Sequence, residues 1–147
     1  MTRHFSLAEL VASDTATRQG INNAPPEEVI PNLERLMRTL EVVRTAVGDR
    51  PVIVTSGYRC ERLNRHIGGS ATSAHMDGRA ADIKVVGLTP FEVAEKIRSA
   101  GLILDQLIYE GHWVHVGIAK DGQPPRGQVL TAKFKDGRAT YLQGVHA

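Results

Sequence analysis

The sequence predicts a single α+β domain, and three observations lead to this prediction. Apolar residues recur at helical spacing early in the chain, alternating runs typical of antiparallel strands fill the last third, and no repeat or linker divides residues 1–147. The length of 147 residues, with 41% hydrophobic and 23% charged residues, is typical of one globular domain. We therefore expect helices packed on a small antiparallel sheet.

The first third of the chain is expected to contain one short and one long helix. Ser6 and Glu9 have the spacing of a capping box, which predicts the short helix. The polar residues 14–26 are expected to form an extended segment on the surface. The long helix is predicted by apolar residues at helical spacing (Val29, Leu33, Leu36, Met37, Leu40, Val43 and Val47). It should begin near Ile30, because Pro31 is tolerated only in a first turn.

The middle of the chain is predicted to alternate strands with short helices. β-branched residues make 52–55 a buried strand, and residues 80–86 form a second one. Residues 61–67 can form two helical turns before a Gly-Gly-Ser loop. A capping box with a first-turn proline at 89–92 starts a further helix, which should end at Gly101.

The last third is predicted to begin with a hairpin. A Gly-His pair between residues 105–110 and 113–119 suits a type II′ turn. Side chains opposed across an antiparallel pair share a face, and so do residues two apart on one strand. Glu110, Trp113 and His115 should therefore lie on one face. The other face is apolar throughout and should face the core (Leu107, Tyr109, Val114, Val116 and Ile118).

Residues 128–142 should form a second hairpin with an Asp-Gly turn at its tip. This turn sets Phe134 opposite Ala139 and Ala132 opposite Tyr141. We expect these two pairs to share the buried face of the sheet.

Charge and cysteine content exclude several classes of protein. The formal net charge is +2, so no strong field attracts nucleic acid or a membrane surface. No apolar run approaches the roughly 20 residues that span a bilayer, and the first residues lack the pattern of a secretory signal. Cys60 is the one cysteine, so the core, with or without a metal, must stabilise the fold. We expect neither nucleic-acid binding nor membrane insertion.

Three residues have the chemistry of a metal site. His75 and Asp82 lie seven residues apart and, together with His115, would give tetrahedral zinc three ligands and one open position for water. Such an ion lowers the pKa of its water toward about 7. Glu110 is placed to take the proton of that water, and His112 at the turn tip is the second candidate for this base. Taken singly, each of these groups is also typical of an ordinary surface side chain.

Several short motifs follow one another along the chain. They are Ser56-Gly57-Tyr58-Arg59, Asn64, Gly68-Gly69, Ser73-x-His75-x-x-Gly78-x-Ala80-x-Asp82-Ile83 and Trp113-Val114-His115. In this order they resemble the zinc D-Ala-D-Ala metallopeptidases, a family of bacterial carboxypeptidases, dipeptidases and phage endolysins. The resemblance covers most of residues 5–119 and implies the fold shared with the hedgehog signalling domain. Residues 120–147 would then be a C-terminal hairpin extension of the same domain.

The resemblance also implies roles for individual residues. It implies one zinc ion per chain, on the same three ligands that their chemistry favours: His75, Asp82 and His115. It places Arg59 where a guanidinium would hold the polarised carbonyl oxygen or a substrate carboxylate. Ser73 and Trp113 are expected to contact the substrate, although the Ser73 hydroxyl could equally serve a turn.

The sequence of this chain differs from the family at the position of the catalytic base. Many members have the catalytic glutamate at the position that His112 occupies here. The assignment of Glu110 therefore rests on the predicted hairpin, and His112 stays open as the alternative.

These features predict a monomeric zinc peptidase that hydrolyses amide bonds in the stem or cross-linking peptides of peptidoglycan, most simply a phage endolysin. Such an enzyme would accumulate in the cytoplasm of the producing cell and reach the wall after the membrane is breached. One alternative is a cytosolic D-Ala-D-Ala dipeptidase or carboxypeptidase. The other is a non-catalytic wall-binding or virion module that zinc stabilises. Five basic against two acidic side chains in residues 119–147 give a local charge of +3, which suits a solvated hairpin or weak attraction to an anionic wall.

Overall fold

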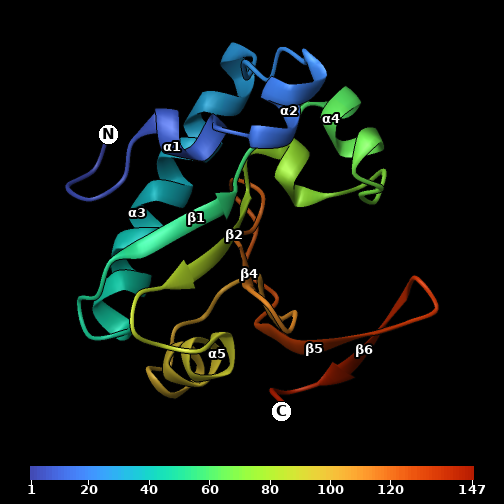
Figure 1. The fold of residues 1–147 in the computed structure, drawn as a ribbon. Helices are drawn as coiled ribbons and strands as arrows, with labels where there is room; N and C mark the ends of the chain where they lie inside the picture. Colours follow the sequence, from blue (N-terminus) through green and yellow to red (C-terminus); the bar gives the residue numbers. More distant parts are fainter.

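The computed structural model describes residues 1–147, and its centre is one six-stranded sheet (Figure 1). The strands are β1 (Val52–Ser56), β2 (Ala80–Val85), β3 (Gln106–Tyr109), β4 (Val114–Gly117), β5 (Gln128–Lys135) and β6 (Arg138–Gln143). Their order across the sheet is β1-β2-β4-β3-β5-β6. The predicted α+β class is confirmed.

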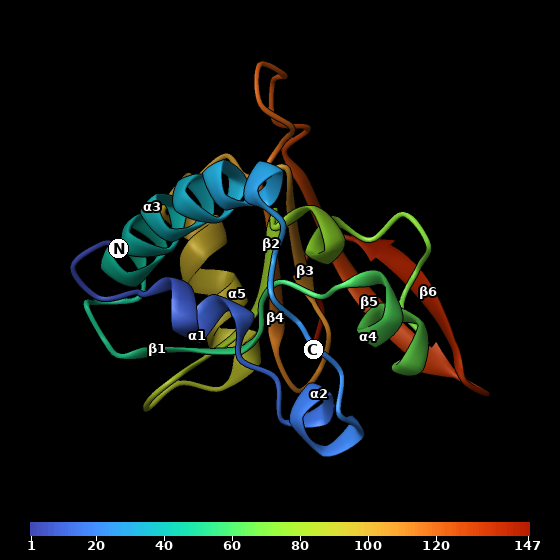
Figure 2. The ribbon, with the colours of Figure 1, turned by 90° about the horizontal axis from the view of Figure 1, so that it is seen from above.

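Five α-helices and two short 3₁₀ segments accompany the sheet. They are α1 (Leu7–Val11), α2 (Asp14–Gln19), η1 (Glu27–Val29), α3 (Ile30–Ala46), α4 (Glu61–His66), η2 (Ala74–Asp77) and α5 (Pro90–Ser99). Figure 2 shows α3 and α5 on one side of the central strands and α4 on the other. None of the helices combines the length and the apolar character that a membrane span requires.

The main core lies between the sheet and α3 and α5. Helix α3 has Pro31 in its first turn, as predicted, and buries its apolar stripe (Leu33, Leu36, Met37, Leu40 and Val43). Each such side chain contributes about 1.5–3 kcal/mol on full burial. The predicted inner face of the first hairpin also joins this core, with Leu107, Val114 and Val116 fully covered. The opposite face of the same strands is therefore free to carry polar groups.

The prediction of an extended segment over residues 14–26 is wrong for its first half, which forms α2. Ser13 caps this helix by accepting a hydrogen bond from the Ala16 amide, and Gly20 ends it in the left-handed conformation. Ala16 then packs with Ile21 and Leu63 in a small separate cluster. Ala16 is the one buried residue of α2, so the sequence has no apolar stripe at helical spacing that would have indicated this helix.

The sheet is antiparallel, as predicted, at every pairing but one, because β5 runs parallel to β3. Strand β4 has β2 and β3 as its two neighbours, and β5 adds at the other edge of β3. The loop after β4 returns the chain to the start of β3, where the Gly127 amide donates to the Leu104 carbonyl over 2.9 Å. The chain therefore enters β5 in the same direction as β3.

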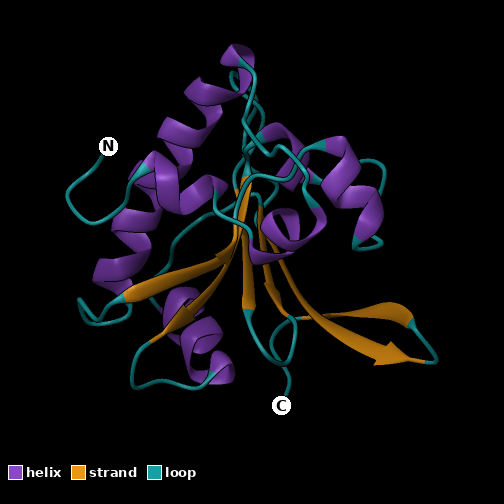
Figure 3. Ribbon diagram, turned by 45° about the horizontal axis from the view of Figure 1, so that its top comes forward, coloured by secondary structure: helices purple, strands orange, loops and turns teal.

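The second hairpin has the predicted pairs, with Phe134 opposite Ala139 and Ala132 opposite Tyr141. The expected burial of these pairs is wrong for three of the four residues. Ala132 is buried, whereas Ala139 is exposed and the exposed fractions of Phe134 and Tyr141 are 59% and 54%. The physical reason is that the hairpin extends away from the helices, so no element covers this face (Figure 3).

Candidate active site

Two of the candidate ligands meet because of strand register. Strand β2 pairs antiparallel with β4, and Asp82 lies directly opposite His115. Opposed residues point to the same face of a sheet. The Nδ1 atom of His115 lies 3.3 Å from Oδ1 of Asp82, and both side chains are buried.

The third candidate, His75, comes from the η2 segment just before β2. Ser73 caps η2 by accepting a hydrogen bond from the His75 amide over 3.2 Å. Gly78 then turns the chain into β2 with a positive φ of 71°. A Cβ atom at Gly78 would lie 2.7 Å from Val29 of the core, so only glycine fits here. This turn brings Nε2 of His75 within 3.4 Å of the carboxylate oxygen Oδ1 of Asp82.

A backbone carbonyl fixes the orientation of the His75 ring. Nδ1 of His75 lies 2.8 Å from the carbonyl oxygen of Gly57, so Nδ1 carries the proton and donates it to this oxygen. Nε2 is then unprotonated, and its lone pair is available to bind a metal ion. Gly57 itself lies against α1, where a Cβ atom would be 2.2 Å from the Leu10 carbonyl oxygen. The glycine of the Ser-Gly-Tyr-Arg motif is therefore needed for this close approach.

The geometry of the three side chains fits a tetrahedral metal ion. One ligand atom from each of His75, Asp82 and His115 lies within 4.8 Å of the others. Metal–ligand bonds of about 2.0–2.1 Å place tetrahedral ligand atoms about 3.3 Å apart, and the distances from the Asp82 oxygen to the two imidazole nitrogens are 3.3 and 3.4 Å. Two imidazoles and one carboxylate form a donor set that suits zinc.

The electrostatic environment favours the protonation states that bind a metal. Burial lowers the pKa of His75, and the neighbouring Asp82 offsets only part of this effect. Burial opposes ionisation of Asp82, but hydrogen bonds with His115 and His75 outweigh it and hold the carboxyl pKa below its usual range. His75 is therefore neutral and Asp82 ionised near neutral pH, as metal ligands must be.

Glu110 lies beside this cluster at the end of β3. Its amide donates to the Trp113 carbonyl over 3.0 Å, which confirms the predicted pairing of these residues. The turn differs from the predicted type II′, because the His112 amide donates to the Glu110 carbonyl and Gly111 has φ of 84°, as in a γ-turn. The Trp113 indole donates to the Glu110 carboxylate. Burial, together with the charge of Asp82, raises the pKa of Glu110.

Arg59 faces the same cluster from the segment between β1 and α4. Its Nη2 atom donates to the Ser73 hydroxyl over 3.4 Å, and its Nε atom is buried with no partner. Burial lowers the pKa of Arg59, while the charges of Asp82 and Glu110 act in the opposite direction. The guanidinium is thus held close to the cluster with donor capacity unused.

A single groove of about 980 Å³ joins these groups. Its floor is the His–Asp–His cluster, and its walls include all four of the other predicted groups that meet here (Arg59, Ser73, Glu110 and Trp113). It extends from the loop 67–74 to the β5–β6 hairpin. His112 does not line it: this residue is exposed at the turn tip, with its ring 6.5 Å from that of Trp113.

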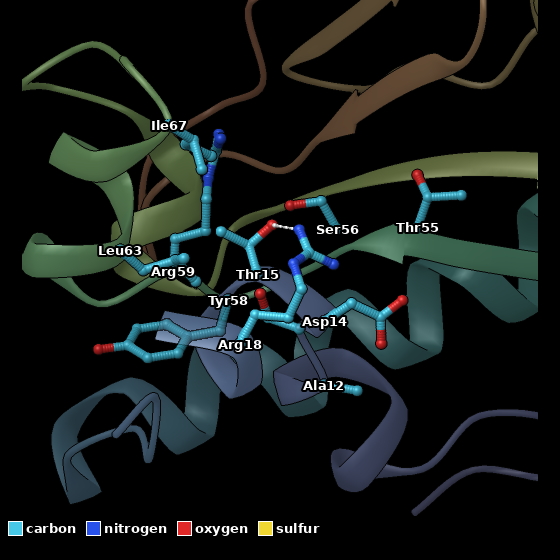
Figure 4. Close-up of a pocket in the computed structure, with 11 residues that line it drawn as sticks. Ala12, Asp14, Thr15, Arg18, Thr55, Ser56, Tyr58, Arg59, Leu63 and Ile67 are labelled. Carbon is cyan, nitrogen blue, oxygen red and sulfur yellow. Dashed lines mark hydrogen bonds between the residues drawn. The ribbon is translucent and has the colours of Figure 1, made fainter. Parts of the chain in front are cut away.

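A smaller pocket of about 370 Å³ lies on the other side of Arg59 (Figure 4). It is formed by the start of α2 and the end of β1, and Arg18 donates to the Thr15 hydroxyl within it over 3.3 Å. Arg59 lines both this pocket and the groove. Ile67 also lines both, so these two side chains lie between the pocket and the groove.

Sequence reasoning missed one residue that positions the Arg59 segment. The side-chain amide of Asn23 donates to the carbonyls of Val11 and Tyr58 over 2.9 and 3.0 Å, and its oxygen accepts from the Cys60 amide over 2.8 Å. Asn23 stands in an Asn-x-Pro-Pro stretch, for which the sequence indicated only an extended segment on the surface. Its long-range contacts become visible only in the folded chain.

Comparisons with known proteins agree with this geometry. A family model described as Peptidase M15 matches residues 3–117. A stretch of 86 residues, 56% of this chain, is 33% identical to the zinc D-Ala-D-Ala carboxypeptidase of Streptomyces albus G. The match spans only 33% of the length of that relative. With the His–Asp–His cluster, these similarities confirm the predicted cofactor, one zinc ion per chain.

Proposed function

This chain belongs to the Peptidase M15 family, and we propose that it is a zinc peptidase that hydrolyses amide bonds in the peptides of bacterial peptidoglycan. The observation that carries the proposal is the meeting of the three ligand atoms with Glu110 and Arg59 in one groove. A relative named for its action on D-Ala-D-Ala supports the substrate class.

Each residue of the site has a separate role in the proposed hydrolysis of the amide bond. Zinc bound by the cluster supplies a Lewis acid that activates water and polarises the scissile carbonyl. Glu110 takes the proton of the attacking water and returns it to the leaving amine, a task for which a raised carboxyl pKa is suited. Trp113 orients the Glu110 carboxylate by its indole hydrogen bond. Arg59 donates to the carbonyl oxygen as negative charge develops on it, with Ser73 holding the guanidinium.

The groove supports a polymeric substrate over a free dipeptide. At about 980 Å³ it is near the upper end of the range for sites that bury a drug-sized ligand, roughly 300–1,000 Å³. We propose that the protein acts as an endolysin, as a monomer, and that it accumulates in the cytoplasm and meets the wall after the membrane is breached. The +3 charge of residues 119–147 supports weak attraction to an anionic wall.

Hydrolysis of purified peptidoglycan by the zinc-loaded protein tests this function. We expect chelation to abolish release of amines from the wall and added zinc to restore it. Glu110→Gln should lower kcat at least 100-fold, because it removes the proton acceptor and keeps the shape. Glu34→Gln, on the exposed face of α3, is the matched control.

Three results would contradict parts of the proposal. A rate that chelation leaves unchanged would exclude the metallopeptidase mechanism. Loss of activity in His112→Ala but not in Glu110→Gln would assign the base to His112. Cleavage of free D-Ala-D-Ala without release from walls would favour the dipeptidase.

A further inference from the structure

The β5–β6 hairpin forms part of the groove wall, although the family match ends at residue 117. Phe134, Ala139 and Tyr141 all line the groove. Phe134 and Tyr141 are diagonal neighbours across the strand pair, each opposite an alanine. Diagonal neighbours lie about 7–8 Å apart, so the two rings and the small residues between them form one apolar surface. We call these three residues, together with Ala132, the aromatic platform.

The charged side chains of the hairpin lie on its other face. Lys133, Lys135 and Arg138 alternate with the platform residues along the two strands, so they point away from the groove. The platform therefore offers exposed rings, and the polar groove residues on the same two strands are the neutral amides of Gln128 and Gln143. Arg126, which also lines the groove, is paired with Asp105 over 2.8 Å. Such a surface suits a neutral ligand with an apolar face and several hydroxyl or amide groups. The platform residues themselves carry no cationic group that would pair with the carboxylates of a stem peptide.

The distance from the metal cluster to the platform limits which part of a substrate can reach it. His115 lies on β4, and Tyr141 lies on β6, three strands across the same face of the sheet. With strands about 4.8 Å apart, Gln143, which is in register with His115, lies about 14 Å across the sheet. Tyr141 is two residues further along β6, so its separation from His115 is about 16 Å. An extended peptide covers about 3.3–3.6 Å per residue, so the platform lies about four to five residues from the reacting bond.

From these observations we infer that the aromatic platform binds a sugar ring of the glycan strand to which the substrate peptide is attached. The inference rests on the proposed function and extends it to a second substrate subsite. An N-acetylated pyranose has an apolar face of C–H groups, which packs on aromatic rings, and its amide and hydroxyl groups can bond to glutamine amides. A stem peptide of four or five residues joins that sugar to the bond that is cleaved. The sugar therefore lies at the distance of the platform.

Kinetics on a matched pair of substrates test the inference. One substrate is a stem peptide that carries the N-acetylglucosaminyl-N-acetylmuramyl disaccharide, and the other is the same peptide without sugar. For the unmodified protein we expect the disaccharide to lower KM about tenfold, which corresponds to about 1.4 kcal/mol. Phe134→Ala combined with Tyr141→Ala should raise KM for the disaccharide-bearing substrate about tenfold relative to the sugar-free peptide and so remove this difference. Tyr141→Phe should retain most of it, because the ring remains.

Leu142→Ala is the matched control, since Leu142 is 46% exposed on the opposite face of the same strand. It should keep the full effect of the sugar. Circular dichroism and zinc content of each variant show whether the hairpin change has disturbed the fold. An equal rise in KM for both substrates in the double variant would assign the platform to peptide and overturn the inference.

Binding of the free disaccharide, followed by NMR shifts of labelled protein, separates this inference from the proposed function. Shifts confined to the hairpin, with neither substrate hydrolysed, would support the platform and contradict the peptidase. Hydrolysis that the sugar does not accelerate, with no shifts at the hairpin, would overturn the platform and leave the peptidase standing.

Discussion

Replacing Asn23 by alanine should destabilise the protein strongly, although Asn23 is only partly buried. Its side chain makes three hydrogen bonds that tie α1, through the Val11 carbonyl, to the segment around Tyr58 and Cys60. Each such bond contributes about 1 kcal/mol net, and its loss leaves a backbone group without a partner. We therefore expect Asn23→Ala to lower the free energy of unfolding by about 2–3 kcal/mol. In a chain of this size the melting temperature should fall by about 6–12 °C.

The neighbouring asparagine provides the control for this measurement. Asn22 is exposed, and its side-chain oxygen accepts one local bond from the Ala24 amide over 3.0 Å. Asn22→Ala should cost less than about 1 kcal/mol. Urea denaturation of both variants, followed by far-UV circular dichroism in the metal-free state, gives the two free energies. Equal losses for the two variants, or a loss below about 0.5 kcal/mol for Asn23→Ala, would refute the bridging role.

Two further predictions concern zinc and acid stability. Zinc at 100 times its dissociation constant should raise the free energy of unfolding by about 2.7 kcal/mol. Calorimetry should show that His75→Ala loses this stabilisation. The control variant His66→Ala, at the exposed end of α4, should keep it. Burial opposes ionisation of Glu41, but hydrogen bonds from the His4 amide and ring outweigh it and lower the Glu41 pKa from 4.5 to about 2. A lowered carboxyl pKa stabilises the folded state above pH 4.5 and loses this effect as the pH falls toward 2. Glu41→Gln should therefore cost about 1–2 kcal/mol at pH 6 and little at pH 2 in urea denaturation, and a pH-independent cost would contradict the assignment.

The elements that sequence reasoning identified correctly depend on contacts between near neighbours. The capping box of α5 is an example, because Thr89 and Glu92 bond to each other's backbone within one turn. The pairing of Glu110 with Trp113 was predictable for the same reason, since two residues separate them. The candidate metal ligands followed from donor chemistry and from a motif resemblance.

The features that were missed depend on distant parts of the chain. Alternation along β5 and β6 indicates that Phe134 and Tyr141 share a face, but it contains no information on whether another element covers that face. Nor does local pattern show that the loop after β4 returns the chain to the start of β3, which makes β5 run parallel to β3. The Gly57 carbonyl that orients His75 belongs to the same class of feature, because 18 residues separate the two groups.

The parallel pairing of β5 with β3 also protects the protein from self-association. Without the hairpin, β3 would present a row of unpaired amides and carbonyls at the rim of the sheet, next to the apolar side chain of Ile108. Exposed strands of this kind template pairing between molecules. The hairpin moves the open edge to β6, which is exposed along its whole length and begins with Arg138. Arg138 places a charge on this open edge, which disfavours pairing with a second molecule.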